Sequence, residues 1–364
     1  MPDSPAILVF RVGLLGDTVV ALPAIDAVRK RFPGRRLVLL TSRPANPAWV
    51  SPWDVLGPTG WFDEAIFYDP SVRSPANLAR LGWMTLALRR RRFESAFVLA
   101  PPRGRRQALR DRIFFQSLCG IPRCFTAAPM APSAVRSAVG EREGLRLLRV
   151  VEPRAGQRDV DAFRLRIPQH ERQIAVRALI DAGIRPGQPM VAFAPGTRMP
   201  AKQWPEERFR AAGTALLARF PALTLVGIGG ADEAALCERL CAAWGARARN
   251  LAGRLSVYGS AEILSRCAAY VGNDSGPMHL AAVVGTPCVA VFSAREARGR
   301  WDPFGTRHIV LRKQTECAGC MLEECEAEAS RCLTAIRVEQ VVRAATLSMG
   351  DAAAGGARAR ELVA

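Results

Sequence analysis

Short apolar runs alternate with helical patterns along most of the chain. The first run, residues 6–12, is followed by a glycine-containing turn and a helical pattern that reaches Phe32. Runs of this kind, bounded by turn residues and followed by helices, are typical of parallel β/α units. Further strand-length runs occupy residues 37–41, 65–68, 96–100, 190–194, 223–228, 269–272, 288–292 and 308–311. The pattern therefore predicts an α/β protein with two series of β/α units.

The two series predict two domains, because 364 residues exceed the size at which a single core stops growing. We expect an N-terminal Rossmann-like domain over residues 1–168 and a C-terminal one over 189–348. The segment 169–188, which includes a predicted helix at 169–182, is interpreted as the linker. Residues 349–364 are rich in Ala, Gly and Arg and are expected to form a flexible tail.

Gly-rich or polar turns directly follow four of the predicted strands. Ligands of open α/β sheets bind at the carboxyl ends of the strands, where all four turns fall. The turns occupy residues 13–17, 195–197, 229–232 and 272–276. We therefore expect two doubly wound domains that face a central cleft.

Positive charge is concentrated in the first half of the chain. The net charge is +18, and residues 1–170 hold 27 Lys and Arg against 14 Asp and Glu. Basic clusters such as 89–92 and 103–106 favour a partner that carries phosphates or carboxylates, or an anionic membrane surface. A solvated basic face is the alternative. The low aromatic content of 7% and the absence of a binding motif argue against nucleic acid as the partner.

The chain has no stretch of about 18 uncharged apolar residues, and its N-terminus lacks the basic and apolar regions of a secretory signal. These features predict a cytoplasmic protein. Its ten cysteines are therefore expected to be reduced thiols, or metal ligands where they cluster.

Four of the cysteines lie in one loop, at Cys317, Cys320, Cys325 and Cys332. The first pair has the spacing of a metal site, and the rest of the loop is long enough to close a tetrahedral Cys₄ site for zinc or iron. Such a site would be structural, because a closed shell leaves no coordination position for substrate. A loop of reduced or redox-labile thiols is the alternative, and the sequence leaves both open.

One further motif resembles a metal site. Asp159, Val160 and Asp161 spell the DxD sequence that some glycosyltransferases use to hold a metal and a diphosphate. No predicted strand precedes it, so we interpret it as a chance occurrence.

Two turns of the second half carry candidate binding residues. Thr197 and Lys202 follow a strand directly, and a hydroxyl and an ammonium suit a diphosphate leaving group. Lys202 is informative because the chain has only three lysines against 48 arginines. Residues 273–282 predict a capped helix whose free N–H groups suit phosphate. His279 in this segment is either part of that site or a core histidine.

The turn after the first strand carries Gly16 and Asp17. Its spacing lacks the G-x-G-x-x-G fingerprint, which disfavours a nicotinamide enzyme. Asp17 opens a helix, where a carboxylate caps free N–H groups. The alternative is that Asp17 faces the cleft as a base.

Taken together, these segments resemble glycosyltransferase family 9, the ADP-heptose:lipopolysaccharide heptosyltransferases. The resemblance is carried by ILVFRVGLLGDTVVALPAIDAVRKRFP, PGTRMPAKQWPEERF, GNDSGPMHLAAVVGTPCVAVFSA with the Trp301-Asp302-Pro303 segment, and CAGCMLEECEAEASRCL. It implies a GT-B fold whose N-terminal domain binds the acceptor and whose C-terminal domain binds the nucleotide sugar.

The resemblance also implies roles for individual residues. Asp17 corresponds to the catalytic base, and Lys202 to a residue that acts on the leaving diphosphate. Asp232 or Glu233 aligns loosely with residues near the ribose or base. The residues that it places around the nucleotide sugar are Gly16, Thr197, Lys202, Asp274, Ser275, Gly276 and His279.

The implied reaction is inverting transfer of heptose from ADP-L-glycero-D-manno-heptose to the inner core, Kdo or heptose, of lipopolysaccharide. No metal cofactor is required for catalysis in the family. The implied partners are the lipid A-linked core and the anionic membrane, which place the protein peripherally on the cytoplasmic face of the inner membrane. Another nucleotide sugar or a protein acceptor within the same fold is the alternative.

Overall fold

The computed structural model describes residues 6–69, 75–101, 104–128, 140–325 and 329–353. It separates into two compact units, which we call the first unit (residues 1–135 and 141–160) and the second unit (136–140 and 161–364). The division falls at residues 160–161, whereas the sequence analysis expects the first domain to end at 168. Segment 169–188, expected as the linker, lies in the second unit and contains helix α8 (Gln169–Asp181).

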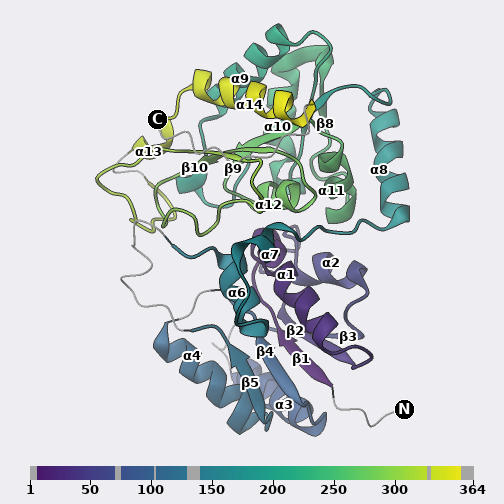
Figure 1. Cartoon of the computed structure of the whole chain (residues 1–364), viewed down its shortest axis with the longest axis vertical. Helices are drawn as coiled ribbons and strands as arrows, with labels where there is room; N and C mark the ends of the chain where they lie inside the picture. Colours follow the sequence, from purple (N-terminus) through teal and green to yellow (C-terminus); the bar gives the residue numbers. More distant parts are fainter. Residues whose placement is uncertain (1–5, 70–74, 102–103, 129–139, 326–328, 354–364) are drawn as a thin grey trace. The chain divides into compact units, whose positions relative to one another are not determined.

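The first unit is built on a five-stranded parallel sheet in the order β3-β2-β1-β4-β5 (Figure 1). Its strands are β1 (Ile7–Phe10), β2 (Leu37–Ser42), β3 (Glu64–Tyr68), β4 (Ser95–Val98) and β5 (Arg123–Thr126). Its helical segments are α1 (Leu15–Arg31), α2 (Pro52–Leu56), η1 (Gly57–Thr59), α3 (Pro75–Arg90), α4 (Arg105–Arg112), the π-helical η2 (Ile113–Leu118) and α6 (Glu143–Val151), with α7 (Gln157–Asp161) at the boundary.

The second unit is built on a six-stranded parallel sheet in the order β11-β10-β9-β6-β7-β8. Its strands are β6 (Met190–Ala194), β7 (Thr224–Gly227), β8 (Ala248–Asn250), β9 (Ala269–Asn273), β10 (Cys288–Phe292) and β11 (Ile309–Arg312). Besides α8, its helical segments are η3 (Pro200–Lys202), α9 (Glu206–Arg219), η4 (Ala231–Glu233), α10 (Ala234–Trp244), η5 (Gly245–Arg247), α11 (Val257–Ser265), α12 (Gly276–Val283), α13 (Arg331–Thr334) and α14 (Val338–Ala353).

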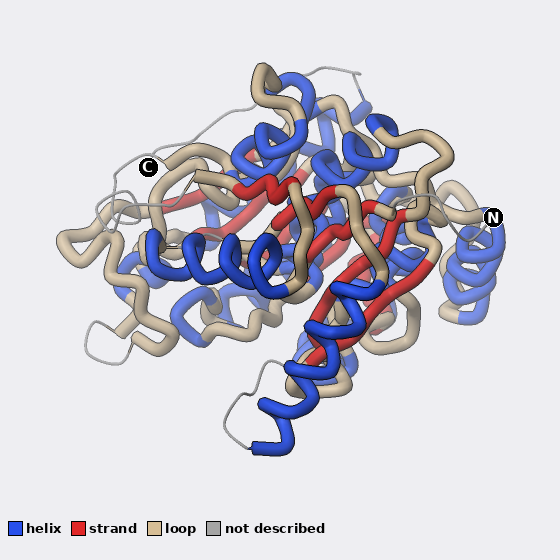
Figure 2. The backbone as a smooth tube through the Cα atoms, turned by 90° about the horizontal axis from the view of Figure 1, so that it is seen from below, coloured by secondary structure: helices blue, strands red, loops and turns tan. Residues whose placement is uncertain are grey.

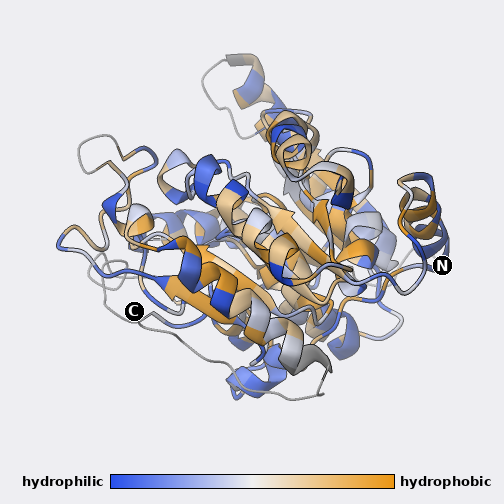
Figure 3. Ribbon diagram, turned by 90° about the horizontal axis from the view of Figure 1, so that it is seen from above, coloured by the Kyte–Doolittle hydropathy of each residue, from blue (hydrophilic) through white to orange (hydrophobic). Residues whose placement is uncertain are grey.

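Burial of apolar strands between helices stabilises each sheet. Every residue of β1, β6, β9 and β10 is buried, and the strands are the most hydrophobic parts of the ribbon in Figure 3. Helices lie on both sides of the strands, which are red in Figure 2. A strand covered on both faces needs apolar residues at successive positions, which explains why these segments read as continuous apolar runs.

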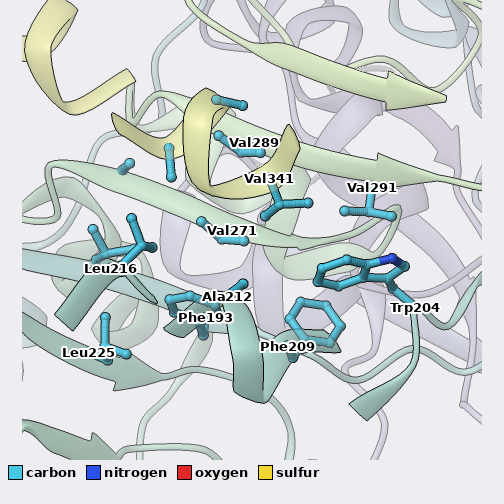
Figure 4. Close-up of a cluster of buried hydrophobic side chains, with 14 of the residues drawn as sticks. Phe193, Trp204, Phe209, Ala212, Leu216, Leu225, Val271, Val289, Val291 and Val341 are labelled. Atoms are coloured by element: carbon cyan, nitrogen blue, oxygen red, sulfur yellow. The ribbon is translucent and has the colours of Figure 1, made fainter. Parts of the chain in front are cut away.

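The core of the second unit contains a cluster of aromatic rings. Trp204 and Phe209 pack edge to face with ring centroids 4.9 Å apart (Figure 4). The buried Trp204 indole N–H donates to the carbonyl of Ile336 at 3.2 Å, so its polar atom is satisfied. Because Trp204 follows Lys202 by two residues, this anchored ring fixes the end of the turn that carries Lys202.

Both sheets reverse their strand order at one point. In the first unit the chain winds from β1 outward through β2 and β3, then returns to place β4 on the other side of β1. The second unit does the same between β6 and β9, so its six strands have the Rossmann order 3-2-1-4-5-6. Doubly wound sheets bind ligands outside the carboxyl ends of the strands at such a reversal. The turns after β1, β6 and β9 occupy these positions.

Among the described residues, the structure contains no helix that combines the length and apolar character of a membrane span.

Candidate functional site

The turns after β6 and β9 are held together by Asn273, which is fully buried. Its side-chain amide donates to the carbonyl of Pro195 at 2.7 Å and accepts from the backbone N–H of Trp204 at 3.0 Å. A single side chain therefore fixes the start and the end of the segment 195–204 against β9. This bridge explains how Lys202 and Asp274, which are distant in sequence, come together.

Lys202 is the centre of a buried charge cluster. Its Nζ lies 2.7 Å from Asp274 Oδ2 and 3.6 Å from Glu296 Oε1, and the three side chains are only 8 to 14% exposed. Burial lowers the pKa of Lys202, but the charges of Asp274 and Glu296 outweigh burial and the net pKa is raised. The cluster therefore presents a permanently cationic ammonium at the carboxyl ends of β6 and β9.

Glu296 lies in the loop after β10 and is itself held by two donors. Trp301 donates its indole N–H to Glu296 Oε2, and Arg295 donates from Nη1 to Glu296 Oε1. The Trp301 ring also lies edge to face with His279, with ring centroids 6.3 Å apart. Glu296 thus connects Lys202 to the wall formed by Trp301 and His279.

Helix α12 is the helix that the sequence predicts within residues 273–282, and its N-terminus is a candidate phosphate-binding element. Ser275 is its N-cap in an extended conformation, and Gly276 and Pro277 form its first turn. The first N–H groups of a helix are free for an anion, and the helix dipole favours negative charge there. Asp274 directly precedes this helix, so the Lys202 ammonium and the N-terminus of α12 lie at one end of the sheet.

Thr197 and Glu233 lie at neighbouring turns. The half-buried Thr197 accepts weakly through Oγ1 from the Met199 N–H at 3.4 Å. Glu233 Oε2 accepts from the Gly230 N–H at 2.8 Å, and burial raises the pKa of Glu233. A Cβ on Gly196 would come within 2.0 Å of Glu233 Oε1, so the absence of a side chain at Gly196 lets Glu233 pack over the turn after β6.

The cysteine-rich loop packs against the turn that carries Lys202. Ala201 donates its backbone N–H to the carbonyl of Glu323 at 3.0 Å. Arg295, which is 5% exposed, donates to the carbonyls of Leu322 at 2.7 Å and Met321 at 2.8 Å. The loop is therefore a structural support for both Lys202 and Glu296.

In the part of the chain that the structure describes, no three His, Cys, Asp or Glu side chains are arranged to hold a metal ion. Burial nevertheless raises the pKa of Cys332, and the nearby Cys317, Cys325 and Cys320 raise it further. The four thiols are thus electrostatic neighbours without forming a ready-made site. The Cys₄ metal site stays a prediction.

Asp17 lies in the turn between β1 and α1. Its Oδ2 accepts from the backbone N–H of Leu14 at 3.0 Å, so Asp17 does cap the helix. Asp17 is half-buried and lies at the strand reversal of the first unit. The capping hydrogen bond uses Oδ2 and does not involve Oδ1, so capping and a catalytic role are compatible.

The approach of Asp17 to the turn depends on Gly13. The φ of Gly13 is +124°, a conformation that favours glycine, and a Cβ there would lie 2.6 Å from Asp17 Cβ. Gly16 lies within the first turn of α1, directly before Asp17. The glycine turn therefore sets the position of the carboxylate.

A cavity of about 610 Å³ opens at the carboxyl ends of β1, β2 and β3. Its floor is apolar and aromatic, including Phe10 and Phe115, and Asp69 and Arg110 lie among its polar lining residues. Helix α3 contributes Leu81 to the wall. An apolar floor with a few charged groups at its edge is the usual composition of a ligand pocket.

The DxD motif has a structural explanation. Asp159 Oδ2 accepts from the backbone N–H of Gly156 at 2.7 Å and caps α7. Asp161 Oδ1 accepts from the backbone N–H of Gly305 at 2.8 Å. Each carboxylate therefore satisfies a backbone donor, in agreement with our interpretation of the motif as a chance occurrence.

Comparison with known proteins identifies the second unit. Residues 156–330 match the sequence model of a family described as glycosyltransferase family 9 (heptosyltransferase). These residues belong to glycosyltransferase family 9. The matched region includes Lys202, Asp274, Glu296 and α12, so the residues that form the buried charge cluster are family 9 residues.

Two curated heptosyltransferases resemble parts of this chain. Lipopolysaccharide heptosyltransferase 2 of Escherichia coli is 35% identical over 112 residues, which are 29% of this chain and 31% of that protein. Lipopolysaccharide heptosyltransferase 1 of Pseudomonas aeruginosa is 31% identical over 140 residues, 38% of each chain. The chain thus spans about a third of the length of the curated relatives that it matches.

A solved structure extends the similarity to nearly the whole chain. The structure of the Escherichia coli ADP-heptose lipopolysaccharide heptosyltransferase II matches 95% of this chain and 99% of its own, with a TM-score of 0.67 and 19% sequence identity. This similarity confirms the predicted α/β architecture with two Rossmann-like domains, the GT-B fold.

The structure brings together most of the residues that the sequence singles out in the second half. Lys202 and Asp274 are ion-paired, and Ser275, Gly276 and His279 begin α12 beside them. The sequence analysis missed Glu296. Glu296 lies four residues after the end of β10. Because ligands of open α/β sheets bind at the carboxyl ends of strands, the loop after β10 could have been searched for it.

Proposed function

We propose that this protein transfers heptose from ADP-L-glycero-D-manno-heptose to the inner core of lipopolysaccharide, with inversion at the anomeric carbon. The observation that carries the proposal is the buried Lys202 ammonium, held by Asp274 and Glu296 beside the N-terminus of α12. A fixed cation and a set of free N–H groups at the strand reversal suit the diphosphate of a nucleotide sugar. The name of the solved structure with the same fold, an ADP-heptose heptosyltransferase, supports ADP-heptose as the donor substrate.

In the proposed reaction, an acceptor hydroxyl attacks the anomeric carbon of heptose. The new bond joins the acceptor oxygen to that carbon, and the bond from the carbon to the β-phosphate oxygen breaks. Asp17 takes the hydroxyl proton, which is general-base catalysis by a carboxylate. ADP leaves with the electron pair, and the single displacement inverts the anomeric configuration.

Lys202 and α12 stabilise the charge that grows on the leaving ADP. Before the nucleotide sugar binds, the two carboxylates Asp274 and Glu296 neutralise Lys202. In the proposed complex the diphosphate shares the ammonium with them. Because the cation is already fixed in place, its reorganisation during bond breaking is small, and this is the main source of electrostatic catalysis.

The first unit is proposed to bind the acceptor. Its sequence carries most of the net positive charge, and a lipopolysaccharide inner core carries phosphates and Kdo carboxylates. Its cavity at the ends of β1, β2 and β3 has aromatic walls with Arg110 at the edge. We propose that the enzyme works as a peripheral protein on the cytoplasmic face of the inner membrane, where the lipid-linked acceptor is made.

The test is a transfer assay with purified full-length protein, ADP-heptose and defined truncated core acceptors. Heptose is expected to appear on the acceptor with stoichiometric release of ADP. Parallel reactions with UDP-glucose and GDP-mannose test the identity of the nucleotide. Transfer from either of these at a higher kcat/KM than from ADP-heptose would reject the proposed donor.

A further inference from the structure

Large exposed apolar side chains are concentrated on two segments of the first unit. Among the described residues, six of the ten such side chains lie on α3 or on the α4–η2 segment. They are Leu78, Trp83 and Leu86 on α3, and Leu109, Ile113 and Leu118 on α4–η2. Trp83 is 71% exposed. Exposing so large an apolar side chain to water is unfavourable, and such patches mark interaction sites.

Helix α3 has an inner and an outer apolar face. Leu81 and Met84 line the cavity and Leu88 is fully buried, so these three residues define the inner face. At 100° per residue, Trp83 and Leu86 point to the opposite side of the helix. Helix α3 therefore packs on the first unit through its inner face, and its outer apolar face is not needed for that packing.

Helices α3 and α4 approach each other at the cavity and at the end of α3. They line the same cavity, which Leu81 of α3 and Arg110 of α4 both contact. Arg89 at the end of α3 also donates to the carbonyl of Leu118 at 3.4 Å. We define the α3–α4 surface as the six exposed apolar side chains of these segments together with Arg89, Arg90, Arg105, Arg106 and Arg112.

Three arginines of this surface have no acidic partner among the residues that the structure describes. In the described part of the chain, Arg90, Arg105 and Arg106 make no ion pair with a carboxylate. Elsewhere in the same unit, by contrast, Arg36 and Arg91 both pair with Glu64. The positive charge of the α3–α4 surface is therefore available to an external anion.

We propose that the α3–α4 surface docks the first unit onto an anionic phospholipid bilayer. Trp83, Leu86 and their exposed apolar neighbours would enter the interfacial region, while the arginines bind headgroup phosphates. The exposed tryptophan and leucines suit the apolar part of the membrane interface, and the arginines without acidic partners suit its phosphates. A protein partner would need to supply a matching acidic and apolar face, which nothing in the chain indicates.

The cavity gives the docking surface a role in the reaction. Because α3 and α4 form both the outer surface and the cavity wall, docking would bring the cavity next to lipids that carry the acceptor. This consequence rests on the proposed function, whereas binding of the α3–α4 surface to a bilayer can be measured without any heptose transfer.

The first experiment is co-sedimentation of the full chain with extruded vesicles. The test vesicles contain phosphatidylethanolamine and phosphatidylglycerol, and the comparison vesicles contain phosphatidylcholine alone. The wild type is expected to bind the anionic vesicles, with affinity that falls as salt rises. The Trp83→Ser/Leu86→Ser variant should bind at least tenfold more weakly. Substitution of Arg90, Arg105 and Arg106 by Gln should weaken vesicle binding by about fivefold per arginine.

The matched control is Ile174→Ser/Ile180→Ser on α8 of the second unit. These isoleucines are 52% and 51% exposed, so the substitution removes similar apolar area from a different surface. The control should bind vesicles as the wild type does. Circular dichroism and thermal melting establish that all variants are folded.

Two outcomes overturn the inference. One is a wild type that does not bind anionic vesicles. The other is equal vesicle binding by the wild type and the Trp83→Ser/Leu86→Ser variant. In the first case, self-association that the Trp83→Ser/Leu86→Ser variant abolishes would assign the surface to a second copy of the chain.

A second assay separates this inference from the proposed function. With a deacylated, water-soluble core acceptor, the Trp83→Ser/Leu86→Ser variant should match the wild type in kcat and KM. With the lipid-linked acceptor in vesicles, the KM of the variant should rise. Vesicle binding without any heptose transfer would contradict the proposed function and leave the docking surface intact.

Discussion

Lys202 Nζ lies 2.7 Å from Asp274 Oδ2, although the two residues are contributed by turns after different strands. The pairing depends on Asn273, which ties the turn after β6 to β9. It joins a permanently positive group to the residue before the N-terminus of α12. This relationship brings two separate sequence motifs together in one cluster, which is the proposed anion-binding site.

Substitution of Lys202 tests the role of this site. Lys202→Ala should lower kcat/KM by about 10²- to 10³-fold, because a fixed donor to the leaving diphosphate is removed. It should also lower the free energy of unfolding by about 3 kcal/mol, since Asp274 and Glu296 lose their buried counter-ion. Steady-state kinetics and denaturant titration measure both effects. Lys30→Ala, which removes an exposed lysine on α1, is the control and should change neither.

The pKa of Lys202 also predicts a pH dependence. Because the folded pKa is raised above 10.5, the stabilisation from this lysine is fully present below that pH and is lost only as pH rises through the folded pKa. Lys202 should therefore stay charged between about pH 7 and pH 9. Over this range the ADP affinity of the wild type should not fall relative to that of Lys202→Ala. A lysine-dependent loss of affinity in that range would contradict the buried ion pair.

Glu296 is expected to act as a positioning residue through Lys202. Glu296→Gln keeps the shape of the side chain but removes one of the two negative charges beside the ammonium. ADP should bind more tightly, because fewer negative charges oppose the diphosphate, while kcat should fall by about 10- to 100-fold because Lys202 is less well placed. Calorimetry with ADP and turnover kinetics report the two quantities separately. A parallel loss of affinity and kcat would argue for a purely structural role.

Glycine at position 13 should be required for the placement of Asp17. Gly13→Ala would force a Cβ to within 2.6 Å of Asp17 Cβ in a backbone conformation that favours glycine. We expect a loss of about 1 to 3 kcal/mol of stability and a large fall in kcat. Gly34→Ala provides the comparison, since Gly34 has a φ of +71° and no atom within 4 Å of the added Cβ. Gly34→Ala should lose stability and keep its kcat. If Gly13→Ala and Gly34→Ala lower kcat equally, the effect of Gly13→Ala does not act through Asp17.

Cysteine reactivity should divide the thiols into two groups. Burial raises the pKa of Cys119 to about 11 and of Cys267 to about 12, so both stay protonated and unreactive toward iodoacetamide at pH 8. If the loop cysteines hold a metal, purified protein should contain one equivalent of zinc or iron. The loop thiols should then react only after a chelator is added. Protein without metal, with four freely reactive loop thiols, would reject the Cys₄ site.

The sequence predicts the central strands well because they are buried on both faces. It misses β5 (Arg123–Thr126) and β8 (Ala248–Asn250), which are short edge strands with charged residues and no continuous apolar run. It also misses α6 (Glu143–Val151), whose arginines obscure an apolar stripe that packs against α1. Edge strands and surface helices are defined by their neighbours, and a local pattern contains little of that information.

The same limit applies to the site. Lys202 and Asp274 stand out because each lies in a turn after a strong strand. The ion pair between them follows from Asn273 and the strand order, which no local motif encodes. The position of Glu296 after β10 makes it a candidate, but its contacts with Lys202, Trp301 and Arg295 are tertiary and are seen only in the folded chain.

The central claim is that Asp17 activates an acceptor hydroxyl toward ADP-heptose. Asp17→Asn keeps an oxygen that accepts the Leu14 N–H, whereas Asp17→Ala also removes the helix cap, at a cost of about 0.5 to 2 kcal/mol. The most direct test measures heptose transfer from ADP-heptose to truncated core acceptors by the wild type and both variants, with ADP affinity measured in parallel. We predict transfer by the wild type, a loss of about 10²- to 10⁴-fold in both variants, and unchanged ADP affinity. Transfer by Asp17→Asn at the wild-type rate would contradict it.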